Sequence, residues 1–242
     1  MFQKSLVEKI FTCHNVFQNF TDDPNWGRIP FEIGIHSFED YLNVEMTQIY
    51  QQDAILEVCK QINFLNFHKV GEIGGSPFVH AKTLHDKYSH LRFLLSDRHE
   101  VYYKTIQELE IFRNTEFFTF DTFSENYSRF IDCDLIMLWG VDLFYSDPQL
   151  IKLLKFISAN NIKLLIGSRS VEYLKYSPKH ILRRIPVTNF LIRIIKRDNL
   201  LQTKFVTSVY RSSVYFRKLS QVVRVNHTDL GDFGTYRVHV FE

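Results

Sequence analysis

The chain has 242 residues, 45% of them hydrophobic and 15% aromatic, which is enough for one domain with a substantial core and an appendage. Its formal net charge of +2 demands no polyanionic partner, and no apolar run approaches the roughly 20 residues of a membrane-spanning helix. The N-terminal stretch lacks the apolar core of a signal peptide. The cysteines, Cys13, Cys59 and Cys133, are widely spaced, which disfavours disulfides or a zinc site and predicts a cytoplasmic protein.

Residues 1–65 differ from the rest of the chain. Turn-forming residues cluster at 21–25, and apolar residues recur at helical spacing from residue 46 to residue 62. No alternation typical of a strand is visible in this part of the sequence. We therefore predict a helical N-terminal cap that packs beside the fold formed by residues 66–242.

From residue 66 onward, strand-like and helix-like segments alternate, a pattern that predicts an α/β fold with a mostly parallel sheet and helices on both faces. The expected strands are 68–73, 91–95, 116–120, 134–139 and 162–166, and the expected helices are 76–88, 101–112 and 147–160. Two further strands, 220–225 and 236–241, are expected to form an antiparallel pair joined by the polar stretch 227–234. The sheet would then have seven strands, with the last one antiparallel.

The stretch 72–78 (EIGGSPF) predicts a strand end, a tight glycine turn and the start of a helix. Ser76 is a preferred N-cap, and Pro77 suits the first helical position, where its missing N–H has no partner to lose. The G-x-G-x-x-G pattern of nicotinamide sites is absent here, and so is the G-x-x-x-x-G-K-[ST] pattern of P-loops. The turn therefore predicts a nucleotide-like ligand of another kind, bound where the backbone comes close to it.

The order of an acid, any residue and two glycines resembles the first motif of the class I S-adenosylmethionine-dependent methyltransferases, E/D-x-G-x-G-x-G. Glu72 and Gly74 match the motif and Gly75 is its second variable position, whereas Ser76 and Phe78 replace its second and third glycines. The resemblance implies a Rossmann-like methyltransferase fold that binds S-adenosylmethionine around these residues. The side chain of Phe78, in place of the third motif glycine, is expected to narrow that site.

Acids also follow the next two expected strands, and this order strengthens the resemblance. Asp97 follows the second strand, where the family places an acid that accepts hydrogen bonds from the ribose hydroxyls. Asp121 follows the third strand, where the resemblance implies contact with the adenine amino group, and the backbone N–H of Thr122 would face the ring. Polar strand ends and turn aspartates are common, but three acids closing three successive strands form a more specific pattern than any one alone.

The strand 134–139 ends at Trp139, and Asp142 follows it. The resemblance implies that residues there face the substrate: Asp142 as a base or as a solvated turn acid, and Trp139 as a wall of the site or as core. His36, in the expected cap, is the histidine that we expect to act in catalysis. His80 and His99 also lie within reach of the site, but a lone histidine is more often structural. No metal-binding motif is present, so no metal is expected.

A basic segment, residues 175–197, contains seven lysines and arginines and no acid. Arg183 and Arg184 lie near its middle, and the segment would suit an anionic acceptor such as a nucleotide sugar or a phosphorylated glycan, or contact with nucleic acid or a membrane surface. An amphipathic helix with a solvated basic face is the alternative. Nucleic-acid binding is less expected, because basic residues without interleaved exposed aromatic residues do not form a convincing surface for stacking bases.

These features together predict an enzyme that methylates a hydroxyl group on a polar small molecule or sugar. The last strand, 236–241, is similar to that of the small-molecule and sugar O-methyltransferases. Two alternatives stay open: a degenerate binding module without catalysis, favoured by the lost motif glycines, and an RNA methyltransferase that uses the basic segment.

Overall fold

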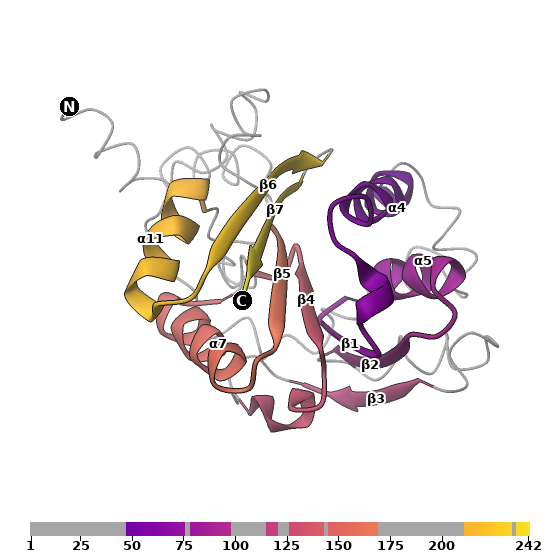
Figure 1. The fold of residues 1–242 in the computed structure, drawn as a ribbon, viewed down its shortest axis with the longest axis horizontal. Coiled ribbons are helices and arrows are strands. Elements are labelled where there is room, and N and C mark those ends of the chain that lie inside the picture. The colour runs from indigo at the N-terminus through magenta and orange to yellow at the C-terminus, as the bar shows by residue number, and fades with distance from the viewer. Residues whose placement is uncertain are drawn as a thin grey trace, which may run out of the picture.

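The computed structural model describes residues 47–75, 78–97, 115–120, 126–142, 145–168, 211–233 and 236–242. Within these residues, one seven-stranded sheet has the order β3-β2-β1-β4-β5-β7-β6 (Figure 1). The strands are β1 Lys69–Ile73, β2 Arg92–Asp97, β3 Glu116–Thr119, β4 Leu135–Trp139, β5 Lys163–Ser168, β6 His227–Phe233 and β7 Tyr236–Phe241. The helices are α4 Thr47–Val58, α5 Val79–Lys87, α7 Asp147–Ala159 and α11 Ser213–Val223, with 3-10 turns η2 Phe64–Asn66 and η4 Tyr127–Phe130.

The directions of the strands confirm the expected fold class. Strands β1 to β5 pair with one another in parallel. Strand β7 runs antiparallel to both β5 and β6 and lies between them. Parallel neighbours require crossover connections, and the described crossover helices lie on both faces: α5 beside α4 on one side, and α7 beside α11 on the other (Figure 1).

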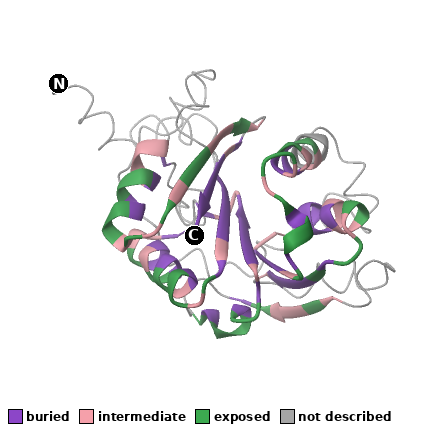
Figure 2. Ribbon diagram, viewed as in Figure 1, coloured by how far each residue is buried: buried purple, intermediate pink, exposed green. Residues whose placement is uncertain are grey.

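Strand β4 lies at the centre of the sheet, and all five of its residues are buried (Figure 2). Its side chains alternate between two cores, as the period of two in a strand requires. Leu135, Met137 and Trp139 join the core on the α4 and α5 side. Ile136 and Leu138 join the core on the α7 and α11 side. The continuous apolar run of 134–139 in the sequence reflects burial on both faces.

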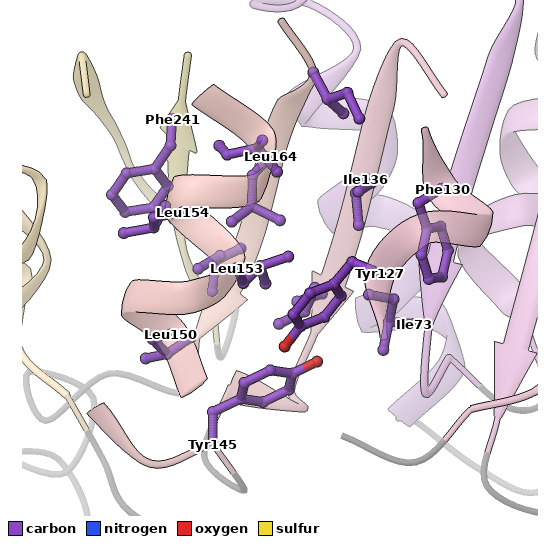
Figure 3. Close-up of a cluster of buried hydrophobic side chains, with 14 of the residues drawn as sticks. Ile73, Tyr127, Phe130, Ile136, Tyr145, Leu150, Leu153, Leu154, Leu164 and Phe241 are labelled. Atoms are coloured by element: carbon purple, nitrogen blue, oxygen red, sulfur yellow. The ribbon is translucent and has the colours of Figure 1, made fainter. Parts of the chain in front are cut away.

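Helix α7 shows how a local signal sets an element. Ser146 is its N-cap and forms a capping box with Gln149, and a proline occupies the first turn. Leu150, Leu153 and Leu154 then point into the core from one face (Figure 3). Burial of each leucine contributes roughly 1.5–3 kcal/mol to stability. Packing and capping therefore both stabilise this helix.

Helix α4 belongs to the part of the chain that we expected to form a cap. Ala54, Ile55 and Val58 are buried in the same core as Val70 of β1 and Leu84 of α5. Its described side chains therefore pack directly on one face of the sheet. Residues 1–46 lie outside the described residues, so the cap as a unit stays a prediction.

The C-terminal part corrects one prediction. Residues 220–225 do not form a strand, because α11 runs to Val223 and ends at Arg224 in the left-handed conformation. Helical spacing places Phe216, Leu219 and Ser220 on the buried face, whereas Val222 is exposed. The valines suggested a strand because β-branched residues favour strands. The polar stretch that we expected to be a loop is instead β6, a strand at the edge of the sheet.

Candidate functional site

The carboxyl ends of three neighbouring strands form one row. The register pairs Ser96 of β2 with Ile73 of β1, and Ile73 with Leu138 of β4. The residues that come next along the chain are Asp97, the last of β2, Gly74, the first after β1, and Trp139, the last of β4. The backbone N–H of Gly74 donates to the carbonyl of Ser96 at 2.7 Å, so the turn after β1 stays beside the end of β2. Open α/β sheets bind ligands outside this edge.

Two glycines form the turn after β1, and each is required for a different reason. Gly74 has φ +66°, a conformation that L side chains rarely adopt, and a β-carbon there would lie 3.0 Å from Val141 Cγ1. Gly75 has no such dihedral, but a β-carbon there would overlap the carboxylate of Glu72. The side chain of Glu72 therefore lies against the turn that follows its own strand.

The start of the next helix differs from the prediction. Helix α5 begins at Val79 and its N-cap is Phe78, with φ 62°, ψ 38° and no capping side chain, so the expectation that Ser76 caps this helix was wrong. Phe78 thus has the left-handed backbone conformation that a glycine favours, and this conformation costs a residue with a side chain about 1–2 kcal/mol. Its ring is fully buried in the core, 6.2 Å from the ring of Phe117, and this burial offsets the strain.

A buried acid–imidazole pair lies behind the turn. Oε1 of Glu72 is 3.0 Å from Nδ1 of His80, and neither side chain is more than 3% exposed. The ring of His80 lies 4.5 Å from that of Trp139. The indole also lies against Gly167, where a β-carbon would be 2.6 Å from Cδ2 of Trp139. The ring centroids of Trp139 and Tyr236 are 5.5 Å apart. Residues from α5, β1, β4, β5 and β7 therefore fix these three side chains together.

Three polar atoms of this cluster are buried and have no hydrogen-bond partner within the described residues. They are Oε2 of Glu72, Nε2 of His80 and Nε1 of Trp139. An unsatisfied buried polar atom costs roughly 1–3 kcal/mol. Such atoms are rare in native proteins, and three on side chains that contact one another at the carboxyl edge of the sheet suit the binding of a polar group.

Asp142, expected as a base or a turn acid, is fully buried after β4. Its Oδ2 accepts a hydrogen bond from Ser168 Oγ at 2.6 Å, and its backbone carbonyl accepts one from Nη1 of Arg211 at 2.6 Å. Arg211 is also buried and donates to the carbonyl of Tyr145 at 2.5 Å. This network suits a residue that holds the loop after β4. Neither Arg211 nor Ser168 could be found from the sequence, because their partners are distant along the chain.

Several predicted site residues lie outside the described residues, and their roles stay predictions. They are His36, Ser76, Asp121, Thr122, Arg183 and Arg184. Across the ranges that the structure does describe, no three histidine, cysteine, aspartate or glutamate side chains gather to hold a metal ion. No helix in those ranges is long and apolar enough to cross a membrane.

The strand order with β7 antiparallel beside β5, together with the glycine turn after β1, defines the fold of the class I methyltransferases. No family model and no curated protein matches the sequence. Among solved structures, the chain is similar to human N-acetylserotonin methyltransferase in complex with SAM, at 15% identity and a TM-score of 0.58. The match covers 91% of this chain and 59% of the human one, so this chain spans less than two thirds of that protein.

Two further solved structures show the same fold. The chain is similar to PigF with SAH at 14% identity and a TM-score of 0.62, over 99% of this chain and 68% of that one. It is also similar to an O-methyltransferase family 2 protein from Planctomyces limnophilus in complex with apigenin. That match has 14% identity and a TM-score of 0.50, and it covers 72% of this chain and 50% of that one. At such identities the likeness establishes the fold.

Proposed function

We propose that this protein is an S-adenosylmethionine-dependent methyltransferase that acts on a hydroxyl group of a small molecule. The observation that carries the proposal is the row formed by Asp97, Gly74 and Trp139 at the carboxyl ends of β2, β1 and β4. The two similar proteins whose structures contain SAM or SAH share this fold, which supports the same cofactor here.

The residues of the row fit this cofactor chemically. Asp97 ends β2, and a carboxylate can accept hydrogen bonds from both vicinal hydroxyls of a ribose. The backbone at Gly74 and Gly75 carries no side chain, so a ligand can approach it closely. Oε2 of Glu72 is a buried acceptor without a partner among the described residues, and it suits an ammonium group. Asp121 and Thr122 would hold the adenine, and Ser76 would flank the turn. Bound there, the cofactor supplies an activated methyl group.

The acceptor is a polar small molecule or sugar. A similar protein was solved with apigenin, which supports a small hydroxylated acceptor rather than a macromolecule. An anionic group on the acceptor would pair with Arg183 and Arg184 in the basic segment. His36 stays our candidate base from the cap, and Asp142 acts by holding the loop after β4. The scattered cysteines favour the reducing cytoplasm as the place of action.

Calorimetry on the full chain tests the proposal, with S-adenosylmethionine and S-adenosylhomocysteine each titrated at up to millimolar concentration. We expect saturable binding of both. Absence of heat and of any thermal shift with either compound would refute the proposed methyltransferase function. Binding of both without methyl transfer to any hydroxylated acceptor would favour the degenerate binding module. The ring of Phe78 is buried in the core and does not occupy the place of the glycine turn. This position argues against the degenerate binding module.

A further inference from the structure

We propose that His80, oriented by Glu72, accepts the proton of the acceptor's hydroxyl group, and that Nε1 of Trp139 donates a hydrogen bond to the same oxygen. This inference rests on the proposed function and assigns its proton acceptor to a residue of α5. The sequence pattern favoured His36 for that role and treated His80 as structural. The carrying observation is the contact between a buried acid–imidazole pair and an indole, each with an unsatisfied polar atom.

The contact between Glu72 and His80 fixes the tautomer of the imidazole. An ionised carboxylate can only accept hydrogen bonds, so the proton of neutral His80 lies on Nδ1, 3.0 Å from Oε1 of Glu72. Nε2 then carries a lone pair and can accept a proton. The same logic orients the histidine of a serine protease, where a buried carboxylate holds the imidazole and stabilises the charged form.

The two unsatisfied nitrogen atoms offer complementary roles. Nε2 of His80 is an acceptor, whereas Nε1 of Trp139 is a donor only. A hydroxyl group both donates and accepts, so one hydroxyl can satisfy both atoms. An amine in its ammonium form only donates and would leave the indole N–H unsatisfied. The pair therefore suits a hydroxyl group better than an ammonium group, in agreement with methylation at oxygen.

The surrounding chain holds this pair rigidly. His80 lies in the first turn of α5, between the carboxylate of Glu72 and the indole of Trp139. The indole fills the space over Gly167, where a β-carbon would be 2.6 Å away. Rigid positioning of a base lowers the entropic part of a barrier, and a base at hydrogen-bond distance contributes about 10²–10⁴ in rate.

The step conserves atoms and charge. The proton moves from the acceptor oxygen to Nε2 of His80, and the imidazolium that forms is paired with Glu72. The oxygen bonds the methyl group with its freed electron pair, while the pair of the broken carbon–sulfur bond stays on sulfur. The positive charge of the sulfonium thus disappears as one appears on His80. The proton later leaves His80 to solvent.

Calorimetry with two hydroxyl probes, phenol and methyl glucoside, tests the proposal in the presence of saturating S-adenosylhomocysteine. We expect one of the probes to bind to wild type and at least tenfold more weakly to His80→Gln. Trp139→Phe keeps a ring and loses only the N–H, and we expect it to weaken the same probe severalfold. His85→Gln is the matched control, because His85 lies on the same helix and contacts Phe93 instead, at 6.4 Å.

The binding of S-adenosylhomocysteine separates the role proposed for His80 from the proposed cofactor site. Equal affinity for it in wild type and His80→Gln, with weaker probe binding only in the variant, supports the inference. Equal probe binding in both, or no probe binding to either, overturns it and leaves the proposed cofactor site standing. With the bound probe as acceptor, we expect His80→Gln to lower kcat at least 100-fold. The decline in rate at acidic pH that wild type shows should also be absent from the pH–rate profile of this variant. A purely structural role would lower the melting temperature and leave that decline in place.

Discussion

A β-carbon on Gly75 would lie 2.5 Å from Cγ of Glu72 and closer still to the carboxylate. Gly75 is the second residue of the turn after β1, and Glu72 is the last but one residue of that strand. The glycine is therefore required by the acid at the end of its own strand. One short segment thus carries both the acid and the residue that leaves room for it.

This relationship predicts that Gly75→Ala is destabilising by about 1–3 kcal/mol, as expected for overpacking. In a Glu72→Ala background the obstacle is gone, and the same change should cost much less. Urea unfolding of the two single variants and the double variant measures the coupling, which we expect at roughly 1 kcal/mol or more. Additive effects would contradict the close contact.

Asp97→Ala should weaken binding of S-adenosylhomocysteine most among the acids at the carboxyl edge. Each charge-assisted hydrogen bond contributes roughly 1.5–3 kcal/mol, so we expect a loss of about tenfold to more than a hundredfold. Calorimetry gives the affinity, and Asp86→Ala is the control, because Asp86 is exposed on α5 and forms an ion pair with Lys82. Equal losses in both variants would disprove a specific role.

Arg211→Met should destabilise the fold strongly. It leaves the buried carbonyls of Asp142 and Tyr145 without their donors, at roughly 1–3 kcal/mol for each group. Urea unfolding should show a loss of about 2–6 kcal/mol. Arg217→Met on the exposed part of α11 should change stability by less than about 0.5 kcal/mol. Similar midpoints for the two variants would show that the network does not hold the loop.

His239 should make stability depend on pH. Burial lowers the pKa of His239 to about 3, whereas an unfolded histidine titrates near 6.5. Between these values the unfolded chain binds one more proton than the folded chain, so stability falls as pH falls from about 6.5 to 3. Wild type should therefore lose about 1.6 kcal/mol more than His239→Phe between pH 6.5 and pH 5. Urea unfolding at both pH values measures the difference, and parallel losses would contradict it.

Arg183→Glu combined with Arg184→Glu tests the anionic acceptor. If the basic segment grips an anion, the double variant should bind the acceptor more weakly and keep its affinity for the cofactor, because surface charges alone change stability little. Unchanged turnover on the identified acceptor would exclude the idea. A gel shift with generic RNA that fades steeply with added salt would point to the RNA alternative.

Much of the fold was predictable because its signals are local. The apolar run of β4, the capping box at Ser146 and the acid at the end of β2 each lie within a few consecutive residues. Strand β6 was missed for the opposite reason. It lies at the edge of the sheet, where burial imposes no apolar alternation, and its register shifts between Asp229 and Gly231.

The five parallel strands in chain order, the glycine turn at Gly74 and the position of Asp97 follow from local sequence, since period, turn chemistry and caps act between near neighbours. Long-range packing decided that Phe78, not Ser76, is the N-cap of α5, and that Glu72 pairs with His80. It also decided that Arg211 reaches back 69 residues to the carbonyl of Asp142. Such contacts depend on which faces the sheet buries together, and that burial is a property of the packed chain rather than of any segment.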